Sequence, residues 1–194
     1  MNTDADQQLI DLAQRLCDEV IALTDRGNAM PVIAIDGRAG SGKSTLAKLL
    51  QNLLFKQGES APRVIHLDDL YEGWQGLAAG LDYMQRNVLT PLSAGKIAHW
   101  QEYDWTLGKR IAWREFEGAT PLILEGCGAL NRNTASFAQF RVWIEADEAL
   151  RKARWQQRDG DKFDQYWASW AAQELDFIAR EKSPEIANYR LFFK

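Results

Sequence analysis

The sequence predicts an α/β protein with a doubly wound, mainly parallel sheet flanked by helices. Short apolar segments rich in β-branched residues alternate with longer segments whose apolar residues recur at helical spacing. A glycine-rich segment, residues 37–45, connects the first of these strands to a helix. Acidic residues follow two other predicted strands, at Asp68 and Glu125. Because the carboxyl ends of parallel strands share one edge of a sheet, these three features are expected to lie together.

The first third of the chain predicts two helices and two strands. Residues 7–26 have leucines at helical spacing, which indicates a helix ahead of the first strand. Residues 31–36 form a short apolar run typical of a buried strand. Residues 43–56 place leucines on one helical face, and residues 63–67 predict a second short strand.

The middle of the chain is less regular. Residues 71–96 are rich in glycine and predict an irregular segment with a short helix at about 82–89. Residues 100–103 and 110–116 have the pattern of a hairpin, which we expect on the flank of the sheet.

The last third returns to the alternating pattern. Residues 121–124 and 140–144 predict the third and fourth core strands. Helices are expected at about 147–157 and 163–180, and residues 189–193 predict an edge strand.

The length and composition predict one soluble domain over residues 1–194. We expect the protein to be located in the cytoplasm. The net charge of −4 gives no support for a nucleic-acid surface. No apolar run approaches the length of a membrane span, and the first residues are polar, unlike a signal peptide. Two cysteines make neither a disulfide framework nor a zinc site. Aromatic residues between Trp100 and Trp113 would suit a pocket or a homo-oligomer interface equally, and nothing else in the sequence supports an oligomer.

One segment matches the G-x-x-x-x-G-K-[ST] pattern of the phosphate-binding loop, or P-loop. Its residues are Gly37, Arg38, Ala39, Gly40, Ser41, Gly42, Lys43, Ser44 and Thr45. Glycines let successive backbone N–H groups turn toward phosphate oxygens, and the following helix directs its positive end at the same anion. Lys43 would reach the terminal phosphates and Ser44 would be a Mg²⁺ ligand. The alternative, a turn with a solvated lysine, is disfavoured by the predicted strand before the loop and the predicted helix after it.

Two carboxylates at strand ends are the next candidates. Asp68 is placed to accept the proton of an attacking hydroxyl or to help hold Mg²⁺. Asp69 is interpreted as a turn former or a partner of Asp68. Glu125 ends a strand expected beside the P-loop strand, where an acidic residue orients Mg²⁺ or its water shell. The alternatives are a turn-forming aspartate and an exposed carboxylate at a strand end.

Three arginines, Arg151, Arg154 and Arg158, recur at i, i+3 and i+7 and therefore share one face of a predicted helix. Cations on that face would neutralise a transferring phosphoryl group. Asp159, Gly160 and Asp161 follow and would form the hinge of a lid covering about residues 151–165. The alternative is a solvated basic face balanced by neighbouring acidic residues.

In these motifs the chain resembles the uridine kinase and phosphoribulokinase branch of P-loop kinases, over about residues 32–159. Besides the P-loop, the similar pieces are Asp68-Asp69-Leu70-Tyr71, Tyr103-Asp104-Trp105 with Arg110, Ile123-Leu124-Glu125-Gly126, and the arginines up to Asp159. They are similar to the family's D-x-F-Y, its Y-D-F with a downstream arginine, its E-G turn and its arginine lid.

The resemblance implies an ATP- and Mg²⁺-dependent kinase that phosphorylates a hydroxyl of a small molecule. It implies that Asp68 is the catalytic base and that Ser44, Asp68 and Glu125 surround the metal, while Lys43 and the three arginines act on the phosphates. The acceptor would contact Asp68 and the residues of the two aromatic motifs, which are Tyr71, Tyr103, Asp104 and Arg110.

The identity of the acceptor stays open. Uridine kinases have a histidine that contacts the base three residues after the phenylalanine of Y-D-F, and this chain has Gly108 there. A nucleoside and a non-nucleoside metabolite are both retained as acceptors. The alternative outside small-molecule kinases is a regulatory NTPase, although the guanine-reading N-K-x-D motif does not occur in the sequence.

Overall fold

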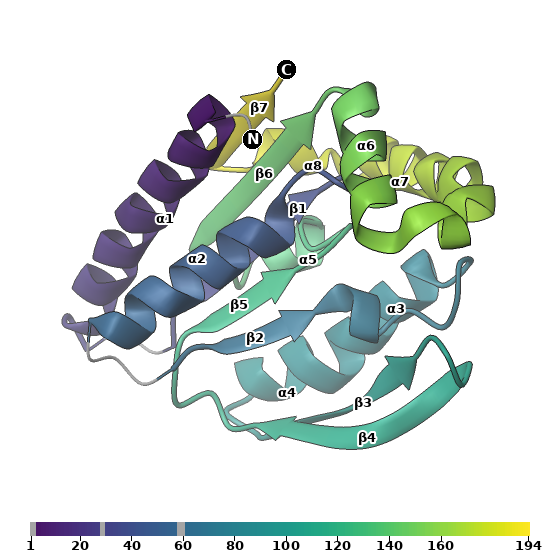
Figure 1. The fold of residues 1–194 in the computed structure, drawn as a ribbon. Helices are drawn as coiled ribbons and strands as arrows, with labels where there is room; N and C mark the ends of the chain where they lie inside the picture. Colours follow the sequence, from purple (N-terminus) through teal and green to yellow (C-terminus); the bar gives the residue numbers. More distant parts are fainter. Residues whose placement is uncertain (1–2, 28–29, 58–60) are drawn as a thin grey trace.

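A five-stranded sheet forms the centre of the computed structural model, which describes residues 3–27, 30–57 and 61–194 (Figure 1). Its strands, in spatial order, are β2 (Arg63–His66), β5 (Leu122–Glu125), β1 (Val32–Gly37), β6 (Phe140–Ala146) and β7 (Tyr189–Phe193). All four neighbouring pairs are parallel. The predicted doubly wound, mainly parallel sheet is therefore confirmed, with β5 beside β1 and β7 at one edge.

Two helices cover one face of the sheet, α1 (Thr3–Thr24) and α2 (Lys43–Lys56) (Figure 1). Their leucines pack against the residues of β1, β5 and β6 that point to this face, which form one buried cluster. Strands β1 and β5 are buried on both faces of the sheet, so apolar residues follow one another in their sequences rather than alternate with polar ones. This burial explains why short apolar runs marked the core strands in the sequence.

The opposite face is covered by α3 (Leu77–Met84) and α7 (Trp167–Glu181), whose apolar residues form a second buried cluster. A π-helical turn (Gln85–Leu89) and α4 (Thr90–Ser93) continue α3 without a break, so the helical segment is about twice as long as predicted. The glycine content of residues 71–96 had suggested irregular structure, and Gly80 is one of these glycines. A Cβ at Gly80 would lie 2.5 Å from a ring carbon of Tyr71, so this glycine allows close packing inside a helix.

The predicted hairpin is present as β3 (Ala98–Asp104) and β4 (Lys109–Phe116), and it lies on the flank of the sheet, where Arg63 of β2 donates to the Glu115 carbonyl oxygen. It is a separate two-stranded antiparallel sheet and does not extend the central one. The hairpin instead docks on the preceding helix, because the Tyr83 hydroxyl accepts the Gln101 N–H at 2.8 Å and Arg110 lies over the Tyr83 ring. Trp100 is buried in this contact, whereas Trp113 is 66% exposed.

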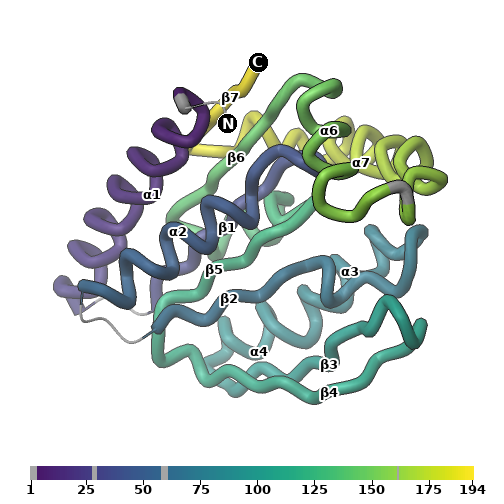
Figure 2. Tube along the Cα trace, in the orientation of Figure 1, coloured from purple at the N-terminus to yellow at the C-terminus, as the bar shows by residue number. Residues whose placement is uncertain are grey.

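Further helical segments follow the carboxyl ends of β5 and β6 or precede α7 and β7 (Figure 2). They are α6 (Glu148–Asp159), a 3₁₀ segment (Gly160–Tyr166) that precedes α7, and the short helices α5 (Arg132–Ala135) and α8 (Ser183–Ile186). The helix predicted at 163–180 thus starts as a 3₁₀ segment. The predicted hinge coincides with the end of α6, where Gly160 has φ of 61°.

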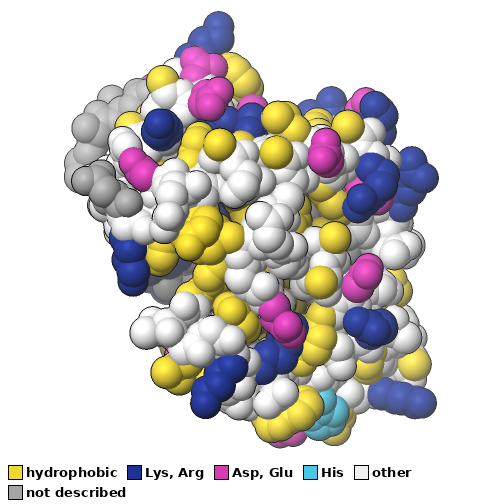
Figure 3. All heavy atoms as spheres, turned by 90° about the vertical axis from the view of Figure 1, so that its right-hand side faces the viewer, with side chains coloured by type: hydrophobic (Ala, Val, Ile, Leu, Met, Phe, Trp, Pro, Cys, Tyr) yellow, Lys and Arg dark blue, Asp and Glu magenta, His cyan; other side chains and the backbone are white. Residues whose placement is uncertain are grey.

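The face that carries α6, α7 and the end of the hairpin has charged and hydrophobic side chains intermingled (Figure 3). None of the helices in the described ranges combines the length and apolar character that a membrane crossing requires.

Candidate nucleotide-binding site

The P-loop connects β1 to α2 as predicted, and its glycines have backbone angles that other residues rarely adopt. Gly40 and Gly42 have φ of 78° and 113°. A Cβ at Gly40 would lie 2.3 Å from the carbonyl oxygen of Arg151, so only glycine lets α6 approach the loop this closely. Helix α2 starts at Lys43, directly after Gly42, and directs its N-terminal N–H groups toward the loop.

Asp36 ties the start of the P-loop to the loop after β5. Its carboxylate accepts the N–H groups of Gly37, Gly128 and Leu130 at 2.6, 2.8 and 2.9 Å, using both oxygens. Burial raises the pKa of Asp36 to about 7, although the three N–H donors act in the opposite direction. Sequence reasoning overlooked this residue, although an acid at the end of an apolar strand, directly before a P-loop glycine, was a visible signal.

We expect the Asp36→Asn variant to be destabilised by about 1–3 kcal/mol, because an amide NH₂ would face one of the buried N–H donors. Urea denaturation followed by tryptophan fluorescence measures the change. The exposed Asp82→Asn on α3 serves as the control, and equal stabilities of the two variants would contradict the role given to Asp36.

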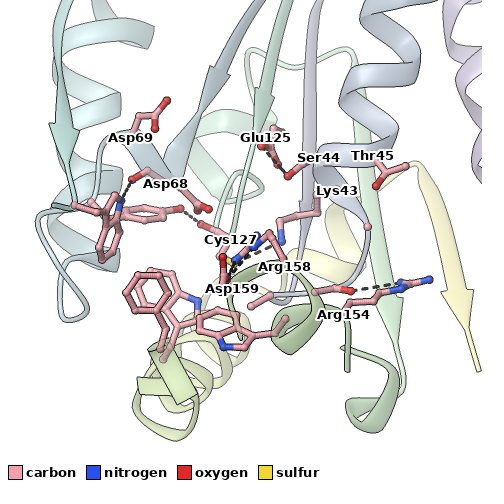
Figure 4. A pocket seen from close by; sticks show the side chains of 18 of the residues that line it. Lys43, Ser44, Thr45, Asp68, Asp69, Glu125, Cys127, Arg154, Arg158 and Asp159 are labelled. Atoms are coloured by element: carbon pink, nitrogen blue, oxygen red, sulfur yellow. Dashed lines mark hydrogen bonds and ion pairs between the residues drawn. The ribbon is translucent and has the colours of Figure 1, made fainter. Parts of the chain in front are cut away.

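A cavity of about 570 Å³ lies between the P-loop, the carboxyl edge of the sheet and α6 (Figure 4). Its polar lining includes eight residues of the predicted site: Lys43, Ser44, Thr45, Asp68, Tyr71, Glu125, Arg154 and Arg158. The structure thus brings the P-loop and both strand-end carboxylates to one space.

Lys43 is 8% exposed, and its ammonium group lies at the wall of this cavity. Its Nζ donates to the carbonyl oxygen of Arg38 at 3.1 Å and lies 3.6 Å from the Cys127 thiol. Burial alone would lower the pKa of Lys43, but Cys127, Glu125 and the other carboxylates around it raise that pKa overall. The carboxylates around the ammonium group therefore favour its charged form.

Glu125 links the P-loop to β2. Its carboxylate accepts the Ser44 hydroxyl at 3.1 Å and contacts Nδ1 of His66 at 2.5 Å. Burial would raise the pKa of Glu125, but the contacts with His66, Lys43 and Ser44 outweigh burial and lower it. The same contact raises the pKa of His66. Glu125 is therefore held as a carboxylate beside the Ser44 hydroxyl.

The Ser44 hydroxyl and the Glu125 carboxylate suit Mg²⁺, which binds one or two protein oxygens and completes its coordination shell with phosphates and water. Within the described ranges, no three His, Cys, Asp or Glu side chains meet as a metal-binding group. A donor set of Ser44 and Glu125, with Asp68 across the same cavity, fits a metal that arrives with a nucleotide.

Asp68 lies in a short 3₁₀ turn, Leu67–Asp69, directly after β2. In Figure 4 its carboxylate points into the cavity. Asp69 also lines the cavity, although its carboxylate points away from the centre in this view. Desolvation within the cavity and the nearby Glu125 raise the pKa of Asp68, although its side chain is accessible to solvent, while Lys43, Arg158 and His66 act in the opposite direction. Burial also raises the pKa of Asp69 to about 6.

The three predicted arginines lie in different environments. Arg158 lines the cavity and pairs with Asp159 at 2.7 Å. Arg154 also lines the cavity and donates to the Ser41 carbonyl oxygen at 3.1 Å. Arg151 is 1% exposed, and its guanidinium donates to the carbonyl oxygens of Ala146 and Ala39 beneath the loop. The structure therefore does not bring Arg151 to the cavity, because its donors are already engaged by backbone.

The structure does not bring the predicted acceptor-binding residues of the hairpin to the cavity. Asp104 accepts the N–H groups of Thr106 and Leu107, which shapes the hairpin turn. Arg110 is held by Glu72 at 2.7 Å. Tyr103 packs edge-on against the Trp105 ring, and it is Trp105 that lines the cavity.

Tyr71 does line the cavity, but its ring is buried and its hydroxyl donates to the Cys127 carbonyl oxygen. Gly108, where uridine kinases have a histidine, closes the hairpin turn with φ of 63°.

An aromatic wall and a buried carboxylate were missing from the predicted site. The wall consists of Trp74, Trp105, Trp155, Phe163 and Trp170, and Trp74 is its centre, with ring centroids 4.8–6.0 Å from the other four. The carboxylate is Glu174 of α7, whose Oε1 accepts the Ala39 N–H of the P-loop at 2.7 Å. Glu174 follows Trp167 and Trp170 on the apolar face of its helix, and a charge on such a face was a detectable signal.

The parallel sheet and the geometry of the glycine loop between β1 and α2 define a P-loop protein. A family model described as an AAA domain matches residues 33–168, so the chain belongs to this family. No significant match to a curated protein sequence was found.

Two solved structures share the fold. One is a possible uridine kinase from Bacillus stearothermophilus, with a TM-score of 0.66, 21% identity, and coverage of 95% of this chain and 98% of the other. The second, from Silicibacter sp. TM1040, is provisionally assigned as a fructose transport system kinase. It has a TM-score of 0.61 and 22% identity, and the alignment covers 96% of this chain and 98% of the other. At these identities the similarity shows the fold.

Proposed function

We propose that this protein is an ATP- and Mg²⁺-dependent phosphotransferase that moves the γ-phosphate to a hydroxyl group of a small molecule. The observation that carries the proposal is the shared cavity, which places the Asp68 carboxylate opposite Lys43 and the Ser44–Glu125 pair. A site that only hydrolysed nucleotide would need to position water, whereas a carboxylate facing a cavity beside the P-loop suits proton removal from an alcohol held there. The provisional kinase assignments of the two structures with this fold agree with the proposal.

Each residue then has a defined task. The P-loop N–H groups and Lys43 would hold the β- and γ-phosphates, and Ser44 with Glu125 would hold Mg²⁺ or its water shell. Mg²⁺, when bound, supplies positive charge to the phosphates. Asp68 would accept the proton of the acceptor hydroxyl, and Arg158 would balance the charge on the phosphates from the predicted lid, residues 151–165. The aromatic wall would keep water from competing with the acceptor.

The test is phosphate transfer from ATP to a panel of nucleosides, sugars and vitamin precursors, with mass spectrometry of the products. A phosphorylated small molecule, formed only with Mg²⁺, is the expected result. Nucleotide hydrolysis that is stimulated only by another protein would contradict the proposal and favour a regulatory NTPase.

The pH dependence follows from the environment of Asp68. A base must be ionised, and a raised pKa moves that ionisation above the ordinary value for aspartate, about 3.9. We therefore expect kcat/KM to fall as the pH falls through the raised pKa of Asp68, and to do so at a higher pH than for an ordinary carboxyl group. A pH profile of the initial rate measures this.

The variants Asp69→Asn and His66→Gln test whether the acid limb of the pH profile belongs to Asp68. Both side chains have raised pKa values near the cavity and could produce a similar limb. The limb should persist in both variants. If Asp69→Asn removes it, the titrating group is Asp69.

A further inference from the structure

Ala39, the third residue of the P-loop, is held through both of its backbone polar groups by side chains from distant helices. Its N–H donates to Glu174 of α7 at 2.7 Å. Its carbonyl oxygen accepts from Nη1 of Arg151, on α6, at 3.3 Å. These two helices flank the 3₁₀ segment 160–166, which belongs to the predicted lid. The P-loop is therefore hydrogen-bonded to the helix before residues 160–166 and to the helix after them.

Glu174 is a buried carboxylate whose oxygens are fully used. It is 2% exposed, and besides Ala39 it accepts from Arg38 Nε at 3.2 Å and from the Cys127 thiol and the Trp170 indole, each at 3.1 Å. Leaving a charge in an apolar interior is costly unless hydrogen bonds satisfy it. Two of the four donors come from the P-loop itself, so the loop and the α7 carboxylate stabilise each other.

Arg151 is the corresponding buried cation on the other side. It is 1% exposed, and its Nε donates to the Ala146 carbonyl oxygen at 3.0 Å and lies 3.4 Å from Glu145. The α6 backbone also contacts the loop, because a Cβ at Gly40 would lie 2.3 Å from the Arg151 carbonyl oxygen. Arg151 therefore supports the loop from beneath.

We propose that Arg151 and Glu174 are positioning residues that clamp Ala39 between α6 and α7 and so maintain the shape of the P-loop that binds phosphate. The inference rests on the proposed function only in requiring that the loop binds a nucleotide. It replaces the expectation that Arg151 contacts the transferred phosphate. Nucleotide affinity then depends on the packing of the two helices as well as on the loop sequence.

A double-mutant cycle on MgADP affinity tests the clamp without an acceptor or turnover. Each single variant, Glu174→Gln and Arg151→Met, is expected to weaken binding by about tenfold, or about 1.4 kcal/mol, because the loop loses a charge-assisted hydrogen bond that restrains Ala39. The double variant should lose clearly less than the product of the two single losses, because both side chains restrain the same residue. Wild-type affinity in either single variant, or full additivity in the double variant, would overturn the proposal.

Matched controls on the same helices are Lys152→Gln and Asp176→Asn, which remove exposed charges outside the cavity. Both should bind MgADP like the wild type. Glu174→Asp keeps the charge but shortens the side chain, and it should retain more affinity than Glu174→Gln. This variant also carries the test if Glu174→Gln does not fold.

Amide hydrogen exchange in the free protein separates the clamp from the proposed function. In Glu174→Gln, or in Glu174→Asp if the former is unfolded, residues 38–43 should exchange faster while β1 and β5 stay protected. Unchanged exchange in the loop would overturn the clamp even if the wild type binds nucleotide. Absence of nucleotide binding by the wild type, with the expected loss of protection in the variant, would contradict the proposed function and leave the clamp supported.

Discussion

The Asp68→Asn variant is expected to lose acceptor phosphorylation by a factor of about 10²–10⁴ while it binds MgATP close to the wild-type affinity. Asparagine has nearly the same shape but cannot accept the proton of the acceptor hydroxyl. The carboxylate of Asp68 points into the cavity, and no hydrogen bond to another described residue occupies it. The loss should therefore appear in kcat, measured as single-turnover phosphate transfer, with affinity measured separately by calorimetry.

Asp69→Asn is the matched control, because it removes the neighbouring carboxylate, which points away from the centre of the cavity. It should retain most of its activity. If Asp68→Asn transfers phosphate at near the wild-type rate, Asp68 is not the base and its carboxylate has another function at the site.

The second large effect is expected for Lys43→Met, which keeps the length of the side chain and removes its charge. Loss of one preorganised donor to developing negative charge costs about 10²–10³ in rate. MgATP affinity should fall as well, since the ammonium group would bind phosphates before and during transfer. Steady-state rates and MgATP titrations of the same preparation measure both effects.

The removal of Lys43 also changes the electrostatics of the carboxylates. Lys43 lowers the pKa of Asp68 and of Glu125, so in the variant both should ionise at higher pH. The residual activity should accordingly have its acid limb at higher pH than the wild type. Lys48→Met, an exposed lysine on the same helix, should change neither rate nor profile. Equal activities of Lys43→Met and the wild type would contradict the P-loop assignment.

The core strands and the P-loop could be predicted because their signals are local. A continuously apolar strand, a glycine loop and an amphipathic helix are each specified by neighbouring residues, and residues 43–56 form a helix within the predicted bounds. The expectation that the strand ending in Glu125 lies beside the P-loop strand is also confirmed. By contrast, the helix that begins at Leu77 was predicted only from about residue 82, because the close contact between Gly80 and Tyr71 is not visible in the local sequence.

The acceptor side of the cavity could not be predicted for a similar reason. Tyr103, Asp104 and Arg110 match a family motif, but the hairpin that carries them docks on Tyr83 and uses their polar groups in its own turn and contacts. The aromatic wall is assembled from three segments between Trp74 and Trp170 that are distant in the sequence. No local sequence pattern predicts that aromatic residues from distant segments pack together.

The sequence by itself determined the fold class, the phosphate-binding loop and the pair of carboxylates at the strand ends, because each depends on residues adjacent in the chain. Only the tertiary structure decided which charged side chains reach the cavity. Arg151 and Arg158 share one helical face in the sequence, yet Arg151 is buried under the loop and Arg158 faces the nucleotide site. The physical reason is that burial and hydrogen-bond satisfaction depend on what packs against a side chain, and here α7 and the P-loop come from opposite ends of the chain.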